Sequence, residues 1–136
     1  MATIFHQLPT PHEYNELRRL AEWPTYDEQV VEKALSHTLF SVVARDESGA
    51  IIGMGRILGD NAIYMHIQDV IVRPDVQGKG IGKLIMDELL EYIEKVKVKN
   101  TNVGLMCSKG REKFYAGFGF VERPGEKFGA GMSKVL

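Results

Sequence analysis

The chain has 136 residues, 44% of them apolar and 26% charged, which is ordinary for a globular fold, so we expect one domain over residues 1–136. The formal net charge of −1 and the lack of a long Lys/Arg block argue against nucleic acid as a partner. Because there is a single cysteine, no charged and apolar leader and no long apolar span, we expect a cytoplasmic protein in a reducing compartment, with no membrane partner.

The N-terminal part of the chain predicts one strand and two helices. Residues 3–8 form a short mixed apolar run that is typical of a strand. Thr10 and Glu13 have the spacing of a capping box, which predicts that a helix begins there. Thr25 and Glu28 repeat this spacing and predict a second helix.

Three strand-like segments follow, over residues 39–45, 50–58 and 62–72, and short turns containing Gly, Asp and Asn join them. We expect an antiparallel meander. Gly53 and Gly55 lie inside the middle strand, where glycine weakens pairing and indicates a bulge or a close backbone approach.

The residues from Val72 to Gly82 join a buried strand to a long helix. Residues 69–72 are β-branched and apolar apart from Asp69, as in a strand covered on both faces, and Pro74 ends its pairing. Apolar side chains recur at helical spacing on one side of the helix: Ile81, Leu84, Ile85, Leu89, Ile93 and Val96. The other side has charged residues that can pair at i,i+4: Lys83, Asp87, Glu91 and Lys95.

Gly78, Gly80 and Gly82 lie where the first amides of this helix are unpaired. Since glycine has no Cβ, a phosphate can approach the backbone and meet the positive end of the helix dipole. The spacing G-x-G-x-G matches neither the P-loop G-x-x-x-x-G-K-[ST] nor the dinucleotide fingerprint G-x-G-x-x-G. A glycine-rich turn without a ligand is the alternative.

The last part of the chain predicts further strands around a short helix. Residues 101–107 predict a buried strand parallel to the strand before the glycines. Residues 108–116 predict a helix, and residues 119–122 and 132–136 predict two last strands. We expect Cys107 to fill the core rather than to carry an acyl group.

Two motifs in this region resemble those of a known family. Gln77, Gly80 and Gly82 match the pattern [Q/R]-x-x-G-x-[G/A], with V-x-P before it at residues 72–74. About thirty residues later, residues 114–120 match the pattern F-Y-x-x-x-G-F. With these motifs in this order, the chain resembles the GNAT acyl-CoA N-acyltransferases. The resemblance implies an α/β fold with a mixed sheet, in the order β-α-α-β-β-β-α-β-α-β-β.

The resemblance further implies acetyl-CoA as the co-substrate. Its pyrophosphate would lie on the loop residues Gln77, Gly78, Lys79, Gly80, Ile81, Gly82 and Lys83, and its pantetheine arm on the main chain of Ile71 and Val72. Ser108 stands where many members have an asparagine that bonds the pantetheine, and a serine hydroxyl replaces only part of that bonding. A small-molecule primary amine as acceptor and a homodimer are also implied.

Direct attack of an amine on a thioester requires a neutral amine and a proton for the departing thiolate. Tyr115 is the acid that the resemblance implies, because a tyrosine with a reference pKa of about 10 is protonated at neutral pH. The alternative for Tyr115 is a core position packed beside Phe114 and Phe118.

Two side chains are candidates for the proton acceptor. Asp69 is the one acid within the apolar strand, where a charge is costly unless it is paired or used. It would activate a water as the base, bond the amides of a loop, or pair with an arginine such as Arg56. His66 is the other candidate, because imidazole titrates near neutrality and His66 shares a strand face with Gln68, whose amide cannot take a proton.

Other interpretations of the sequence remain. Trp23 and Tyr26 anchor the core or, by the resemblance, line the acceptor pocket. No Cys/His/Asp cluster has metal-ligand spacing, so we predict no metal. Gln68 and Ser108 favour an alternative function, a non-catalytic acyl-CoA-binding regulatory module, and an N-acetyltransferase that acts on proteins or peptides is a further alternative.

Overall fold

The structure is a computed structural model that describes residues 1–136. The chain forms two compact units, residues 1–105 and residues 106–136. The first unit contains β1 (Thr3–Phe5), α1 (Pro11–Leu20), α2 (Glu28–Leu35), β2 (Phe40–Arg45), β3 (Ile51–Gly59), β4 (Tyr64–Val72), a 3-10 turn (Pro74–Val76), α3 (Ile81–Val96) and β5 (Asn102–Leu105). The second unit contains α4 (Glu112–Ala116).

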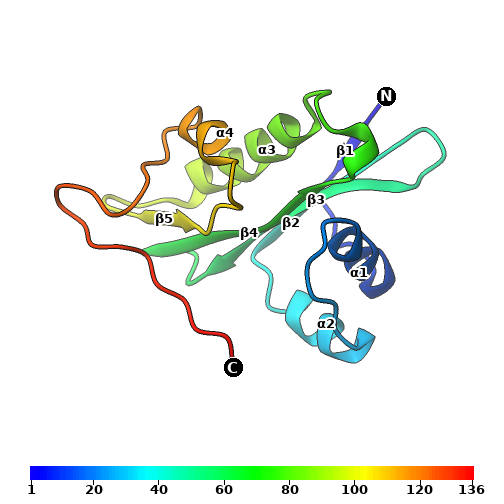
Figure 1. The fold of residues 1–136 in the computed structure, drawn as a ribbon, viewed down its shortest axis with the longest axis horizontal. Helices are drawn as coiled ribbons and strands as arrows, with labels where there is room; N and C mark the ends of the chain where they lie inside the picture. The colour runs from blue at the N-terminus through cyan, green and yellow to red at the C-terminus, as the bar shows by residue number, and fades with distance from the viewer. The chain divides into compact units, whose positions relative to one another are not determined.

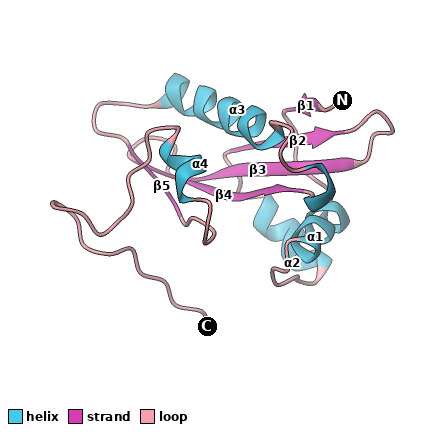
Figure 2. Ribbon diagram, turned by 45° about the horizontal axis from the view of Figure 1, so that its top comes forward, coloured by secondary structure: helices cyan, strands magenta, loops and turns pink.

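The first unit is a five-stranded sheet with helices on both faces. The strand order is β1-β2-β3-β4-β5, and all neighbours are antiparallel except β4 and β5, which are parallel. Helices α1 and α2 cover one face and α3 covers the other, as Figures 1 and 2 show. The predicted α/β class with a mixed sheet and the predicted meander of β2, β3 and β4 are therefore confirmed.

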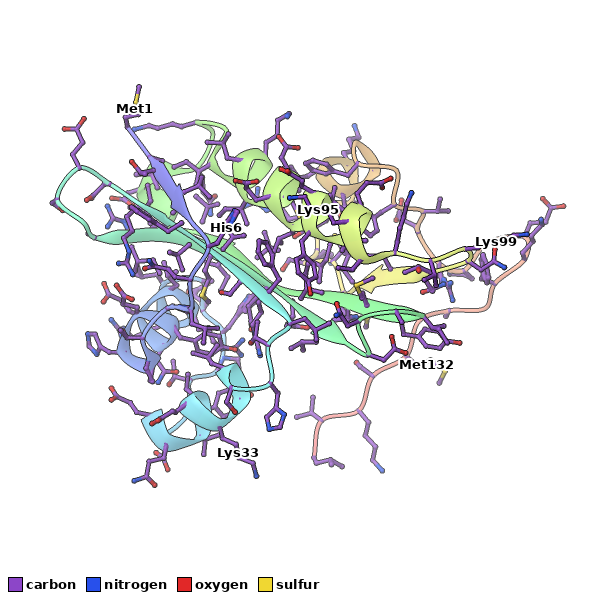
Figure 3. The ribbon with its side chains drawn as sticks, turned by 180° about the vertical axis from the view of Figure 1, so that it is seen from behind. Met1, His6, Lys33, Lys95, Lys99 and Met132 are labelled. Atoms are coloured by element: carbon purple, nitrogen blue, oxygen red, sulfur yellow. The ribbon has the colours of Figure 1, made fainter.

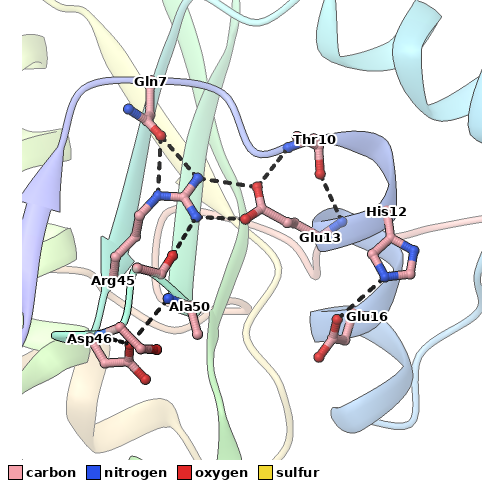
Figure 4. Close-up of polar contacts among 10 residues, drawn as sticks. Gln7, Thr10, His12, Glu13, Glu16, Arg45, Asp46 and Ala50 are labelled. Carbon is pink, nitrogen blue, oxygen red and sulfur yellow. Dashed lines mark hydrogen bonds and ion pairs between the residues drawn. The ribbon is translucent and has the colours of Figure 1, made fainter.

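The predicted capping box at the start of α1 is confirmed (Figure 4). The Glu13 amide donates to Thr10 Oγ1 at 3.1 Å, and the Thr10 amide donates to Glu13 Oε1 at 3.0 Å. Arg45 of β2 donates to the same carboxylate at 2.6 Å and to Gln7 at 2.9 Å. The Arg45 bond lowers the pKa of Glu13, so the helix start is tied to the sheet by an ionised carboxylate.

The second predicted capping box, at Thr25, is wrong. Helix α2 begins at Glu28, and the preceding Asp27 makes no side-chain cap. The reason lies at Tyr26, whose carbonyl accepts from the Asn15 side-chain amide at 2.7 Å and whose amide donates to the Asn15 oxygen at 3.1 Å. These two bonds hold the main chain of Tyr26 against α1, outside the helix.

The glycines inside β3 mark a close approach, as predicted. A Cβ on Gly53 would lie 2.9 Å from Cδ1 of Ile85, and a Cβ on Gly55 would lie 2.9 Å from Cγ2 of the same residue. Helix α3 therefore packs directly on the backbone of β3. A β-bulge is also present, since the register between β3 and β4 shifts by one residue between Met54 and Arg56.

Helix α3 buries Ile81, Ile85, Met86, Leu89 and Ile93 against the sheet. Leu84, which the periodicity placed on the apolar side, is 44% exposed, because Met86 rather than Leu84 completes the buried face. Both predicted i,i+4 ion pairs form, Lys83 with Asp87 at 2.7 Å and Lys95 with Glu91 at 3.4 Å.

The N-terminal segment reaches across to this helix. In Figure 3, which shows the molecule from behind, His6 lies beside α3, and its Nε2 is 3.2 Å from Glu88 Oε1. The His6 ring also meets the Phe40 ring edge-on with centroids 4.9 Å apart, and Phe40 stacks on Tyr92 at 4.5 Å. These contacts fix the edge of the sheet on α3.

The two strands predicted at residues 119–122 and 132–136 are absent from the structure, in which residues 117–136 form no helix or strand. Glycine and proline are frequent in this segment and weaken strand pairing, which is the physical reason. The interpretation of Cys107 as core filler is also wrong, because β5 ends at Leu105 and Cys107 is exposed.

Candidate active site

Strand β4 has an open edge along its C-terminal part. Its pairing with β5 ends at Ile67, which lies opposite Leu105, whereas its pairing with β3 continues to Val72. From Gln68 to Val72, the edge that faces away from β3 therefore has no strand partner. The predicted cofactor residues Ile71 and Val72 lie on this edge, where main-chain groups can bond an extended ligand.

The loop after β4 presents a row of free amides. No main-chain carbonyl accepts from the amides of residues 78–83, and the first main-chain bond after them runs from the Leu84 amide to the Gly80 carbonyl. Gly80 is the N-cap of α3, a helix of 16 residues, and gives it no side-chain cap. Free amides at the positive end of a long helix are suited to a phosphate.

Glycine is required here by the backbone. Gly78 has φ +81° and Gly80 has φ +83°, in the left-handed region, and nothing lies within 4 Å of a Cβ on either. Gly82 lies in the first turn of α3. The Gln77 side chain donates to the Val72 carbonyl at 3.0 Å, so it closes the loop back onto β4. The predicted loop residues thus form one continuous surface.

The charges beside the loop are partly paired. Arg73 makes two bonds to Asp75, at 2.7 and 2.9 Å, and Lys83 is paired with Asp87. Lys79 is exposed and makes no salt bridge. A phosphate on this loop would therefore meet one unpaired ammonium group beside the amides.

Asp69 lies in the bulge of β4, with φ +59°. Its Oδ1 accepts from Arg18 Nη1 at 2.8 Å. Its Oδ2 accepts from the Tyr14 hydroxyl at 2.7 Å and from Arg56 Nε at 2.8 Å. The pairing with Arg56 that the sequence raised is therefore confirmed, and the residue joins α1, β3 and β4.

The Asp69 cluster is buried and carries two positive charges against one negative charge. The side chain of Asp69 is 1% exposed, and those of Arg18 and Arg56 are each 10% exposed. The pKa of Tyr14 is raised to about 12, mainly by burial and secondly by the negative charge of Asp69. Because both carboxylate oxygens accept from buried donors, the geometry favours the structural alternative for Asp69, and a role as proton acceptor stays a prediction.

Sequence reasoning missed Arg18 and Tyr14. A signal existed, because Arg18 lies four residues after Tyr14 and therefore on the same side of α1, the apolar side. The guanidinium of Arg18 lies 5.5 Å from the ring of Tyr14, 5.3 Å from that of Trp23 and 5.5 Å from that of Tyr26. Its Nε also donates to the Pro24 carbonyl at 2.7 Å, so Arg18 holds the segment between α1 and α2.

The two aromatic side chains of that segment have different exposures. Trp23 is half-buried and packs against the core between α1, α2 and the sheet, as core anchoring predicts. Tyr26 is 51% exposed although its main chain is bonded to Asn15 on both sides.

His66 and Gln68 form a polar pair on β4. Nε2 of His66 lies 3.2 Å from Oε1 of Gln68, and both residues are half-buried, so their predicted common strand face is confirmed. In the sheet register, His66 lies opposite Leu58 of β3 and Gly104 of β5.

The second unit holds Tyr115 and Ser108. Tyr115 is a half-buried residue of α4 whose ring meets that of Phe114 edge-on at 5.0 Å, and its hydroxyl has no hydrogen-bond partner within the chain. The pKa of Tyr115 is raised, mainly by burial and secondly by the electrostatic effect of the nearby Cys107, so its hydroxyl stays protonated. Ser108 is exposed.

Cys107 is a poor candidate for an acyl carrier. Although Cys107 is exposed, partial desolvation of its sulfur and, second to it, the charge of Glu112 raise the pKa of the thiol. The reactive thiolate is therefore disfavoured at neutral pH.

No group of three or more His, Cys, Asp and Glu side chains is arranged to hold a metal ion. None of the helices has both the length and the apolar character needed to cross a membrane.

Comparisons with known proteins identify the family. The family model described as Acetyltransferase (GNAT) domain matches residues 10–135. A crystal structure of a protein of unknown function and probable acetyltransferase from meticillin-resistant Staphylococcus aureus is 33% identical, with a TM-score of 0.91 and 100% of each chain covered. A GNAT family acetyltransferase from Streptococcus pneumoniae is 27% identical, with a TM-score of 0.82 and coverage of 100% of this chain and 98% of that one.

A curated relative, the uncharacterized N-acetyltransferase ycf52 of Porphyra purpurea, is 28% identical over 115 residues. That match covers 80% of this chain and 65% of the relative's length. The family model extends over almost the whole chain, and the sheet, the glycine loop and helix α3 occur in the order that the resemblance implies. The chain therefore belongs to the GNAT acetyltransferase family.

Proposed function

We propose that this protein transfers the acetyl group of acetyl-CoA to the primary amine of a small molecule, by direct attack within a ternary complex. The observation that carries the proposal is the open edge of β4, which continues into the free amides of residues 78–83 at the start of α3. Such a continuous surface suits a ligand with an extended, amide-containing arm and a pyrophosphate.

Two parts of acetyl-CoA have matching groups on this surface. The pyrophosphate would accept from the amides of the loop, with Lys79 beside it. The pantetheine arm would bond main-chain groups of Ile71 and Val72, as an added strand does.

Tyr115 is the proposed acid. Its raised pKa keeps the proton on the hydroxyl at neutral pH, so that the proton is available when the thiolate departs. No covalent acyl-enzyme is required, because an amine attacks a thioester directly. This agrees with the raised pKa of the Cys107 thiol.

The proposal of a cationic amine as acceptor draws support from the surface charge of α1, α2 and the segment between them. The exposed acids there are Glu22, Asp27, Glu28 and Glu32, whereas the exposed bases are Arg19 and Lys33. This excess of negative charge attracts an ammonium group. A lysine-bearing peptide would be attracted in the same way, so the assay includes one.

The test is release of free CoA from acetyl-CoA, measured with a thiol reagent in the presence of arylalkylamines, polyamines, aminoglycosides and a lysine-containing peptide. We expect release with at least one small amine and none without an amine. Release with the peptide alone would replace the small-molecule acceptor with a protein. Binding of acetyl-CoA without release for any amine would favour the regulatory module. Homodimer formation is part of the proposal and is tested by light scattering.

A further inference from the structure

We propose that Arg18, together with Arg56, binds an anionic group of the acceptor, so that the small molecule acetylated by this protein has both an amine and a carboxylate or phosphate. This inference rests on the proposed function and narrows its acceptor to amines that also carry a negative charge. The geometry that points to it is a buried cluster with an excess positive charge, next to the open edge of β4.

The charges of the cluster do not balance. Arg18 and Arg56 each form one salt bridge, and both bridges go to the same carboxylate, that of Asp69. The third donor to that carboxylate is the Tyr14 hydroxyl, which adds a hydrogen bond but no charge. An uncompensated charge is costly in a buried setting, and an anion bound beside the two guanidinium groups removes that cost.

Two guanidinium nitrogens are left for a ligand. Arg18 donates from Nε to the Pro24 carbonyl and from Nη1 to Asp69. Arg56 donates from Nε to Asp69 and from Nη1 to two oxygens at and just after the end of α2. Ser41 Oγ is the one buried side-chain polar atom that lacks a partner, so the unpaired Nη2 of each arginine is in contact with solvent. An anion can accept from these nitrogens without breaking a bond of the cluster.

The surroundings of Arg18 hold its guanidinium in place. The rings of Tyr14, Trp23 and Tyr26 lie 5.3 to 5.5 Å from it. Tyr26 is 51% exposed, yet Asn15 bonds its main chain on both sides, so a fixed aromatic surface stands beside the guanidinium. A planar donor that is ordered before the ligand arrives loses little entropy when it binds a carboxylate or phosphate.

The cluster lies where the acetyl group of the co-substrate would be. Asp69 belongs to the part of β4, from Gln68 to Val72, whose outer edge has no strand partner. Its side chain bonds α1, on the face of the sheet that α1 and α2 cover (Figure 2). Under the proposed function the pyrophosphate is on the loop after Val72, so the arm runs from there toward Gln68 and its acetyl end comes level with Asp69. An acceptor held by its anion at the cluster therefore has its amine close to the thioester.

Two charge patterns act on the two ends of such an acceptor. The exposed acids of α1, α2 and the segment between them attract its ammonium group during approach. At close range the excess positive charge of the cluster attracts the anionic group and repels an amine that has none. The acceptor class that satisfies both patterns is an amine with a carboxylate or phosphate on the same small molecule.

The test compares matched acceptors in the CoA-release assay. Amino acids are paired with their amides, and aminoalkyl phosphates with the corresponding amino alcohols, so that each pair keeps the amine and loses the anion. We expect kcat/KM to be about 10–100-fold higher for the anionic member, which is what a hydrogen bond to a charged group supplies. A preference within only the carboxylate pairs or only the phosphate pairs supports the inference and identifies the anion.

Arg18→Met assigns the preference to this site. The change leaves the neutral pair of Asp69 and Arg56 and keeps an unbranched side chain among the rings, and the preference should fall by about tenfold or more. Both members of a pair are measured in the same variant, so a general loss of activity cancels in the ratio. Arg19→Met is the matched control, because Arg19 is the next residue of α1 and is exposed. It removes the same charge and should keep the preference.

Trp23 gives a readout that needs no turnover. It is the single tryptophan of the chain, and its ring lies 5.3 Å from the Arg18 guanidinium. Its fluorescence should change saturably with the anionic member of a pair but not with the uncharged one, and Arg18→Met should abolish the change. If Arg18→Met does not fold, Arg18→Lys replaces it, because an ammonium keeps the charge without the planar fork, and the preference should fall severalfold.

The inference is overturned if the parent acetylates charged and uncharged members equally, or if a folded Arg18→Met keeps the preference. Both results leave the proposed function standing, since CoA is released in each. The opposite combination is a parent that releases no CoA with any amine while Trp23 responds to the anionic members alone. That result would refute the proposed function and retain the anion site.

Discussion

Replacing Asp69 with asparagine separates a structural role of this residue from a chemical one. Asparagine is nearly the same size and tolerates the left-handed backbone that Asp69 adopts at φ +59°, so the bulge itself is retained. What changes is the charge and one acceptor oxygen. Two buried arginines, each 10% exposed in the side chain, then face a neutral group.

The cost follows from the burial of the cluster. Removing one partner of a buried ion pair leaves an uncompensated charge and costs about 3–5 kcal/mol. A domain of this size has a free energy of unfolding of about 5–15 kcal/mol, so the loss is a large share of it. At roughly 3–4 °C for each kcal/mol, Tm should fall by about 10–20 °C.

The assay is urea denaturation and calorimetry at pH 7, with Asp75→Asn as the control. Asp75 also pairs with an arginine, but its side chain is 64% exposed, so its loss should change stability by less than about 1 kcal/mol. Parental stability of Asp69→Asn together with a lost kcat would refute the structural reasoning and make Asp69 a participant in the chemistry.

Four further predictions follow from the same geometry. Because the pKa of Tyr14 is raised to about 12, its contribution to stability is present below pH 10 and is lost as pH rises toward 12, so an alkaline titration should destabilise the parent but not Tyr14→Phe over that range. Gly53→Ala should cost about 1–3 kcal/mol, because its Cβ would meet Ile85 at 2.9 Å, whereas Gly104→Ala, another strand glycine with more room, should cost less in the same denaturation assay. Gly80→Val should lose acetyl-CoA binding in calorimetry, since φ +83° strains a β-branched residue, and unchanged affinity in a folded variant would contradict the loop assignment. Tyr115→Phe should lower kcat by about 10²–10⁴ with little change in acetyl-CoA affinity, and a parental kcat where chemistry limits turnover would reduce Tyr115 to packing.

The sequence predicts best what is local. The strand, glycine loop and helix from residue 69 to residue 96 were predictable because periodicity, glycine spacing and i,i+4 charges are all read within one stretch. The capping box at Thr10 was predictable for the same reason. The same pattern at Thr25 failed because Asn15, on another helix, bonds the main chain of Tyr26.

The partners of Asp69 show what the sequence leaves open. Tyr14 and Arg18 are 55 and 51 residues away from Asp69 in the chain, and only the packing of α1 on the sheet brings them together. The bulge that turns Asp69 toward α1 is likewise a property of strand register rather than of local composition. The sequence raised Arg56 as a partner but could not choose between pairing and chemistry.

The central claim is that the loop and open strand edge bind acetyl-CoA so that its acetyl group passes to an amine. The most direct measurement is the mass of the amine product after incubation with acetyl-CoA, followed in parallel with CoA release, for the parent and for Gly80→Val. The account predicts that the parent adds one acetyl group to a small primary amine for each CoA released and that Gly80→Val adds almost none at the same concentration of acetyl-CoA. A parent that binds acetyl-CoA tightly while no amine gains an acetyl group would contradict it.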